Sequence, residues 1–289
     1  MIENRLRTSA PLHYNLTLRV SEMDALRCSF FLICSFLLLS SGGLIADDAA
    51  LAEVFTRHGI EGTIVISSLQ GGQTFVFNES RARQRFSPAS TFKIANTLIS
   101  LEEHAISGKN AVLKWDGRID EIADWNHDQT LESAFRVSCV WCFQALAERV
   151  GAERYRDYQQ AINYGALSEP FAQTTFWLDG SLTISAIEQV EFLKQVYQRS
   201  LPFSAAAYET LRAIMLVEET PAYAIRAKSG WATRLTPRVG WYVGYVETPS
   251  DQPTEVWFFA TNIVARSASD LPLRQRLTRE ALQAVGIID

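Results

Sequence analysis

The chain has 289 residues, of which 47% are hydrophobic and 20% are charged. It is long enough for one large domain or two closely packed ones, and this balance is typical of a globular protein rather than a disordered one. A net charge of −5 gives no reason to expect a nucleic-acid partner.

Residues 1–46 differ in character from the rest of the chain. Their centre, residues 28–39, is mainly apolar, with Arg27 before it and small residues after it. The run is too short to span a bilayer and has the layout of a secretory signal, with Met23 as an alternative start. A buried or amphipathic helix is the competing interpretation. We expect residues 1–46 to be removed on export, leaving 47–289 as one folded domain without a stable membrane anchor.

Hydrophobic periodicity and turn residues predict the elements of the exported domain in chain order. These are a helix at 49–57, a hairpin of strands 63–66 and 74–77, helices at 90–102, 131–150, 152–162 and 185–193, strands at 224–231, 239–246 and 255–262, and a closing helix at 273–285. Strands at both ends with helices between them predict an α+β fold. We expect an antiparallel sheet flanked by the terminal helices, with an inserted all-helical lobe.

A serine and a lysine open the helix predicted at 90–102. Ser90 and Lys93 are three residues apart, so their side chains share one helix face. Ser90 would lie at the helix N-terminus, where free N–H groups and the helix dipole favour developing negative charge. Lys93 can accept the hydroxyl proton only if an apolar pocket lowers its pKa. The pair alone also fits a capping serine followed by a solvent-facing lysine.

Two later segments change this balance. Residues 138–140 (Ser-Cys-Val) lie in a strongly apolar stretch, and residues 228–230 (Lys-Ser-Gly) close a predicted strand. The order S-x-x-K, S-x-V, K-S-G resembles that of the penicillin-recognising serine enzymes, and within them the class D, oxacillinase-type serine β-lactamases. The resemblance extends to the Phe-Trp-Leu-Asp-Gly run at 176–180 and the Leu-Pro-Leu-Arg run at 271–274. It covers essentially the whole chain from about residue 48.

The resemblance implies a periplasmic enzyme that hydrolyses small-molecule β-lactam antibiotics and confers resistance to them. Ser90 would attack the lactam carbonyl and form an acyl-enzyme. The backbone N–H groups of Ser90 and Trp231 would form the oxyanion hole. Ser138 would carry a proton towards the lactam nitrogen, and Lys228 would supply positive charge beside it.

A substrate-binding set follows from the same resemblance: Ser229, Gly230 and Arg274. Ser229 and Arg274 would bind the substrate carboxylate, Arg274 through its planar fork of donors. Without the resemblance, Arg274 would be expected to be a solvated surface residue. The segment 231–238 beside the third motif should shape the preference among β-lactams, but the sequence leaves that preference and the oligomeric state open.

Lys93 is expected to provide the general base. Val140 cannot hydrogen-bond, and Trp177 adds apolar bulk where the resemblance places it, so the amine would be largely neutral. A neutral amine adds carbon dioxide, and the resemblance implies N6-carboxylysine at position 93, with no other cofactor and no metal. Trp177 would donate its indole N–H to the carbamate, ordinary core packing being the alternative. The family usually has asparagine at Ala166, which puts in doubt the hydrogen bonding of the loop before Trp177.

The four cysteines divide between the two parts of the chain. Cys28 and Cys34 would leave with the signal, so Cys139 and Cys142 remain, in an oxidising compartment. We expect this C-x-x-C pair to lie inside the helix predicted at 131–150, with no second pair for a zinc site. There we favour two buried free thiols over a tight disulfide, and either over redox catalysis.

Other catalytic plans fit the sequence less well. No G-x-S-x-G elbow occurs, and His58, His104 and His127 lie in no matching context and in no closely spaced metal-ligand cluster. Class A β-lactamases need asparagine where this chain has Val140. The main rival is a β-lactam sensor or penicillin-binding protein, which stays acylated; a D,D-peptidase is the third candidate. A sensor carries several membrane helices ahead of its β-lactam-binding domain, whereas this sequence has one signal-like segment, which disfavours the sensor.

Overall fold

The computed structural model describes residues 48–70, 72–248 and 255–289. The signal expected at 1–46 lies outside these residues. Within the described ranges no helix is long and apolar enough to cross a membrane.

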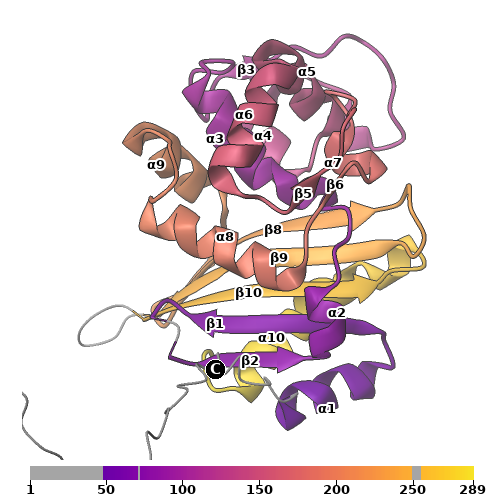
Figure 1. Ribbon diagram of the computed structural model, residues 1–289, viewed down its shortest axis with the longest axis vertical. Helices are drawn as coiled ribbons and strands as arrows, with labels where there is room; N and C mark the ends of the chain where they lie inside the picture. The colour runs from indigo at the N-terminus through magenta and orange to yellow at the C-terminus, as the bar shows by residue number, and fades with distance from the viewer. Residues whose placement is uncertain (1–47, 71, 249–254) are drawn as a thin grey trace, which may run out of the picture. The chain divides into compact units, whose positions relative to one another are not determined.

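A six-stranded antiparallel sheet forms the centre of the domain (Figure 1). Its strands, in spatial order, are β2 (Thr74–Phe77), β1 (Gly62–Ser68), β10 (Glu255–Val264), β9 (Val239–Thr248), β8 (Ala224–Ala232) and β7 (Leu216–Glu219). The first and last strands of the chain meet in the middle, because β1 pairs with β10 from Gly62 opposite Ile263 to Ser68 opposite Trp257. The predicted single antiparallel sheet is confirmed.

Helices cover both faces of the sheet (Figure 1). On one face lie α1 (Ala49–His58) and α10 (Pro272–Ala284). Their apolar residues share a core with buried residues of β9 and β10 such as Val246 and Phe259. On the other lies α8 (Ala186–Gln198), whose Leu193 joins a second core with Val243 and Phe258. The α8 helix begins with a capping box between Ser185 and Glu188.

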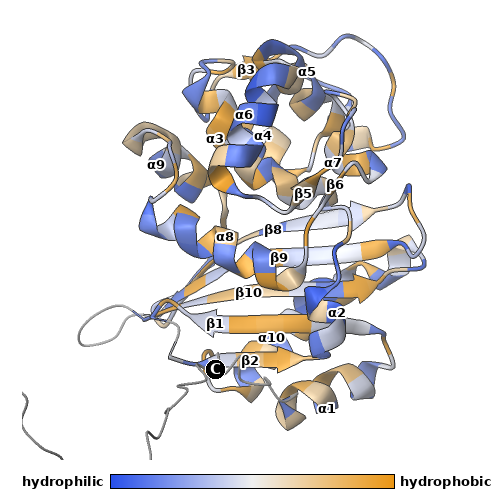
Figure 2. Ribbon diagram, in the orientation of Figure 1, coloured by the Kyte–Doolittle hydropathy of each residue, from blue (hydrophilic) through white to orange (hydrophobic). Residues whose placement is uncertain are grey.

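The remaining elements form the helical lobe and its connections. They are α2 (Glu79–Arg83), the 3₁₀ segments η1 (Ala89–Phe92), η2 (Ala123–Trp125) and η3 (Ala268–Asp270), helices α3 (Lys93–Glu102), α4 (Leu131–Arg136), α5 (Val140–Val150), α6 (Ala152–Ile162), α7 (Phe176–Asp179) and α9 (Ala205–Ile214), and two short ladders, β3 (Val112–Leu113) with β4 (Gln129–Thr130) and β5 (Ala166–Leu167) with β6 (Leu182–Thr183). The central helix α3 is buried throughout residues 93–100. The outer helix α6 is mainly hydrophilic (Figure 2) and buries only Tyr155, Tyr158, Gln159 and Ile162.

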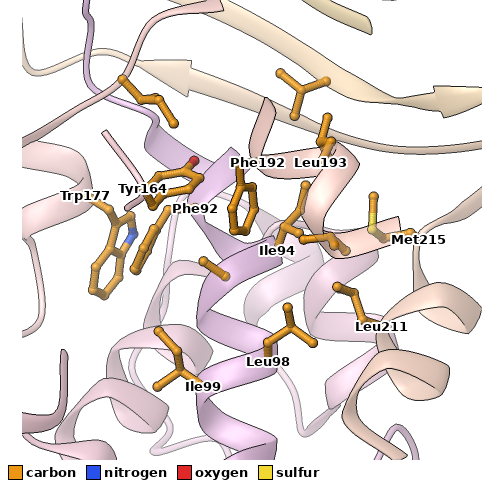
Figure 3. Packing of buried hydrophobic residues seen from close by; sticks show 14 of the residues in the cluster. Phe92, Ile94, Leu98, Ile99, Tyr164, Trp177, Phe192, Leu193, Leu211 and Met215 are labelled. Atoms are coloured by element: carbon orange, nitrogen blue, oxygen red, sulfur yellow. The ribbon is translucent and has the colours of Figure 1, made fainter. Parts of the chain in front are cut away.

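An aromatic cluster joins η1, the segment that carries Ser90, to the rest of the lobe. The ring of Phe92 stacks on Trp177, with centroids 5.8 Å apart, and meets Tyr164 edge-on at 5.5 Å (Figure 3). The Ser87 hydroxyl donates to the Trp177 carbonyl at 2.9 Å, and the Trp241 indole N–H donates to the Ser87 carbonyl at 2.9 Å. The chain on either side of Ser90 is thereby fixed to both α7 and the sheet.

The single helix predicted at 131–150 is wrong, because the structure has two helices there. The α4 helix ends with Ser138 in the left-handed region at φ 58°. The N–H of Ser138 bonds to the Phe135 carbonyl at 3.3 Å, and that of Cys139 bonds to the Ala134 carbonyl at 2.9 Å. This pattern is a Schellman ending, with serine at the position that usually holds glycine. A new helix, α5, starts at Val140.

The expectation of free thiols at Cys139 and Cys142 is also wrong, because the two form a disulfide, with Cα atoms 5.5 Å apart. The error follows from the helix break. Cys139 is the N-cap of α5 and has a non-helical backbone, so its sulfur turns over the first turn of the helix, where it also accepts from the Cys142 N–H at 3.2 Å.

Replacing Gly244 by alanine should destabilise the sheet. A Cβ atom there would lie 2.2 Å from the Arg226 carbonyl oxygen and 2.7 Å from Ala227 Cβ, so β8 and β9 would have to separate. Overpacking of this kind costs about 1–3 kcal/mol. Urea unfolding should show it against the control Gly72→Ala, where nothing lies within 4 Å of the added carbon. Equal midpoints for the two variants would contradict the close contact.

Candidate active site

Ser90 lies on the 3₁₀ segment η1, immediately before α3. The Lys93 amine donates to its hydroxyl oxygen at 2.9 Å, so the pair predicted from sequence does meet on one face. Thr91 anchors the turn, because its hydroxyl donates to the Pro88 carbonyl and accepts from the Gln189 amide at 2.8 Å each. The helix predicted from Ser90 to about Glu102 is confirmed, except that its first turn is 3₁₀.

The Lys93 amine is enclosed. Its side chain is 1% exposed, and its nitrogen lies 5.0 Å from the centre of the Phe143 ring. Burial lowers the pKa of Lys93 well below its usual value, and the positive charge of Lys228 lowers it further. Burial therefore favours the neutral form of this amine, which is the form that could accept a proton from Ser90.

The second and third motifs meet beside this pair. The Lys228 amine donates to the Ser138 hydroxyl, and to the Ser229 carbonyl at 3.0 Å. Its nitrogen lies 5.5 Å from the centre of the Phe135 ring. Burial, and secondarily the charge of Arg274, lower the pKa of Lys228 to about 7. This amine can therefore exchange a proton with Ser138 near neutral pH.

Gly230 lets the strand β8 approach the nucleophile segment. A Cβ atom at this position would lie 3.0 Å from the Pro88 carbonyl oxygen and 3.2 Å from the Thr91 nitrogen. A larger residue would push the strand away. The glycine of the K-S-G motif thus brings the Trp231 end of β8 against the turn that carries Ser90.

Arg274 lies on α10 and reaches the same place from the opposite face of the sheet. Its Nη1 donates to the Gly230 carbonyl at 2.6 Å and its Nε donates to the Leu271 carbonyl at 2.8 Å. Its stem crosses Gly240, where a Cβ atom would come within 2.9 Å of Cδ. Burial lowers the pKa of Arg274 to about 10, so the group stays charged at neutral pH. It is a partly buried, oriented cation, in contrast to the solvated alternative.

A cavity of about 690 Å³ opens above these groups. Its lining includes most of the side chains that the three motifs predict: Ser90, Ser138, Val140, Ser229, Gly230, Trp231 and Arg274. Lys93 and Lys228 lie beneath it, bonded to the two serines. Among the residues that the structure describes, no group of three or more histidine, cysteine or acidic side chains could hold a metal ion.

Known proteins resemble this chain in sequence and in fold. The penicillin-binding protein transpeptidase domain family matches residues 62–283. β-Lactamase OXA-48 from Klebsiella pneumoniae is 39% identical over 81% of this chain and 87% of its own. The class D β-lactamase YbXI from Nostoc is 40% identical, with a TM-score of 0.79 over 82% of this chain and 99% of its own. FUS-1 (OXA-85) from Fusobacterium nucleatum subsp. polymorphum, also class D, is 34% identical, with a TM-score of 0.80 over 84% of this chain and 100% of its own.

The chain belongs to the class D serine β-lactamases. The remaining predicted residue, Trp177, is fully buried on α7 of this β-lactamase. Its indole N–H has no hydrogen-bond partner in the described part of the chain, a costly state for a buried donor. Ala166, where the family usually has asparagine, pairs with Thr183 through the backbone ladder of β5 and β6, which orders the segment before Trp177 without a side-chain amide.

Sequence reasoning missed several residues of the β-lactamase site. Phe143 and Phe135 line the two lysines, and a helical spacing of three residues from Val140 and Ser138 would have pointed to them. Two tryptophans at the cavity mouth interlock: the Trp125 indole donates to the Val137 carbonyl, and the Trp141 indole donates to the Trp125 carbonyl, both at 2.9 Å. Trp125 comes from a distant loop, so no local signal marks it.

The buried lysines of the β-lactamase should make its stability rise with pH. Between the lowered pKa of Lys228, about 7, and its ordinary value of 10.5, the unfolded chain holds a proton that the folded chain lacks. The free energy of unfolding then rises by up to about 1.4 kcal/mol per pH unit. Urea unfolding from pH 7.5 to 9.5 should show a smaller slope for Lys228→Met than for wild type or the exposed-site control Lys109→Met. An unchanged slope would mean that Lys228 keeps its proton on folding.

Proposed function

We propose that this enzyme hydrolyses the amide bond of β-lactam antibiotics through an acyl-enzyme on Ser90 and thereby confers resistance to them. The observation that carries the proposal is the buried Lys93 amine, bonded to the Ser90 hydroxyl at 2.9 Å at the floor of the cavity. We also propose export to the periplasm, on the signal-like character of residues 1–46.

Acylation would use the residues as they stand. Neutral Lys93 takes the Ser90 proton as the oxygen attacks the lactam carbonyl. The backbone N–H groups of Ser90 and Trp231 stabilise the oxyanion, a role that the close approach of β8 at Gly230 supports. The lactam nitrogen then needs a proton. The hydrogen-bonded pair of Ser138 and Lys228 can supply it, because the pKa of Lys228 is lowered to about 7.

Substrate binding would depend on two further residues that line the same cavity. Penicillins and cephalosporins carry a carboxylate next to the lactam nitrogen. Ser229 and Arg274 line the cavity beside Lys228, and Arg274 is already oriented by its bond to the Gly230 carbonyl. A charged hydrogen bond of this kind contributes about 1.5–3 kcal/mol, enough to fix the lactam carbonyl over Ser90.

Lys93 is also a suitable site for carboxylation by carbon dioxide. Its amine is enclosed and its pKa is lowered by burial, and Val140 at the cavity wall offers no competing hydrogen bond. The unpartnered buried indole N–H of Trp177 would suit a carbamate oxygen. When formed, a carbamate would supply a carboxylate general base, which could take the proton of Ser90 in acylation and the proton of a water molecule in deacylation. This pairing supports N6-carboxylysine at position 93.

Turnover should separate the hydrolase from the rival sensor, penicillin-binding protein or peptidase functions. We expect many turnovers of a chromogenic cephalosporin per wild-type enzyme, and at most one burst from Lys93→Ala, with acylation at least about 10²-fold slower, because the base is lost. Ser90→Ala should show no penicillin adduct by intact-protein mass spectrometry. A wild-type reaction that stops after one equivalent would establish a sensor or penicillin-binding protein instead. Penicillin, oxacillin and a carbapenem as substrates would define the spectrum.

Carboxylation of Lys93 should make activity depend on bicarbonate. Stripping bicarbonate at mildly acid pH should lower activity, and adding it back should restore activity together with a carbamate signal in carbon-13 NMR. Trp177→Phe keeps the ring but loses the donor, so it should need about tenfold more bicarbonate for half-maximal activity, as expected for a lost hydrogen bond to a charged group. The matched control is Trp115→Phe, whose indole bonds only to the Arg118 carbonyl. Indifference of the wild type to bicarbonate would exclude the modification.

A further inference from the structure

The Cys139–Cys142 disulfide lies within the catalytic machinery but has no part in the chemistry described above. Both cysteines are 0% exposed, and the bond closes a loop with a sequence separation of three. Val140 and Trp141, enclosed by this loop, line the substrate cavity. The bond therefore lies directly behind the cavity wall.

Cys139 is the junction of two helices. Its N–H completes the ending of α4 by bonding to the Ala134 carbonyl, and its sulfur caps α5 by accepting from Cys142. The same residue therefore bonds to the last turn of one helix and caps the first turn of the next. A covalent bond from this junction to Cys142 fixes the direction in which α5 leaves α4.

The residues on either side of the bond contact the two catalytic lysines. Ser138, directly before Cys139, accepts from the Lys228 amine while its backbone is held at φ 58°. Phe143, directly after Cys142, lies against the Lys93 amine, with 5.0 Å from nitrogen to ring centre. A left-handed serine persists only where its surroundings constrain it. The disulfide is the covalent part of that constraint.

We propose that the Cys139–Cys142 disulfide positions Ser138 and Phe143 for catalysis, so that the acylation rate of this enzyme depends on its thiol redox state. The inference rests on the proposed function of Ser90, Lys93 and Ser138. Reduction by a dithiol breaks the sulfur–sulfur bond, and the dithiol supplies two electrons and two protons. Two thiols form in the enzyme, and the reductant becomes a disulfide.

The bond is a local constraint rather than a major source of stability. The stabilisation that a cross-link provides through the unfolded chain grows with the logarithm of loop length, and this loop is close to the shortest possible. The segment also has other anchors, since the Trp125 indole bonds to the Val137 carbonyl and the Trp141 indole bonds to the Trp125 carbonyl. The fold should therefore survive loss of the bond while the two catalytic contacts loosen.

The test compares two double variants with oxidised wild type. Cys139→Ser with Cys142→Ala removes the bond but keeps a capping oxygen at position 139, because serine is a good N-cap. Cys139→Ala with Cys142→Ala removes both the bond and the cap. The primary measurement is the rate of Ser90 acylation by a penicillin, followed by quenched-flow mass spectrometry. The wild-type steady-state rate, measured beside it, tests the proposed function separately.

We expect both variants to acylate about tenfold more slowly, within the cost of a sub-ångström displacement of a catalytic group. KM should change less than kcat, because Ser229 and Arg274 lie on β8 and α10 and are not attached to this loop. The bicarbonate needed for half-maximal activity should rise, since Phe143 covers Lys93. Thermal midpoints should fall by no more than about 5 °C.

Reduction of the wild type gives an independent arm. Because both sulfurs are buried, dithiothreitol should act slowly under native conditions and faster in mild urea, and the reductant is removed before assay. The reduced wild type should acylate like the double variant that keeps the capping oxygen, reoxidation should restore the rate, and that variant should be unaffected by either treatment. The proposal would be overturned if the variants acylated as fast as wild type. It would also be overturned if they acylated slowly only to the extent that they were unfolded. A hydrolase and a sensor both acylate at the serine, so this test of the disulfide remains valid even if the wild-type protein shows no turnover.

Discussion

The burial of an amine without a counter-charge is the constraint on which the rest of this structure depends. Lys93 is 1% exposed in a lobe whose central helix is buried from residue 93 to residue 100. A charged ammonium in such a place would cost several kcal/mol after relaxation. The nearby positive charge of Lys228 adds to that cost. The fold therefore favours the neutral amine, which is the state that a base for Ser90 would require.

The helical lobe and the sheet must pack closely to bring the other site residues next to this amine. Lys93, Ser138 and their aromatic neighbours come from the lobe, whereas Lys228 and Gly230 come from the sheet. Where they meet, a glycine on β8 brings backbone atoms within about van der Waals distance of the nucleophile turn. Arg274 then reaches through from the far face and bonds to the Gly230 carbonyl. The site is thus a product of tertiary packing, and each of the three motifs contributes residues to the lining of the cavity.

Sequence patterns predicted the elements that packing does not override. The strands of the sheet, the Ser185 cap and the closing helix follow from period, capping chemistry and length, and the structure has them within a few residues. The site residues could be named because the spacing of three motifs is specific. The β7 strand and α9 were not predicted, although they are as long as β2 and α1, which were. The residues of β7 are mostly exposed and show no apolar alternation. The interlock of Trp125 with Trp141 joins distant segments, so only the fold reveals it.

The two wrong predictions have one physical origin, the helix break at Ser138. The helical spacing of buried apolar residues continues from α4 into α5. The pattern of side chains therefore does not show that the φ angle of Ser138 is positive and that the helix ends there. A left-handed ending usually takes glycine, and a serine there costs roughly 1 kcal/mol relative to glycine. Glycine would relieve that strain but would remove the hydroxyl that bonds to Lys228. The chain keeps the strained residue because the left-handed turn points this hydroxyl at Lys228, whereas a continuous helix would carry it elsewhere. Local rules fail here because the bond of this hydroxyl to Lys228, and not helix stability, accounts for the serine.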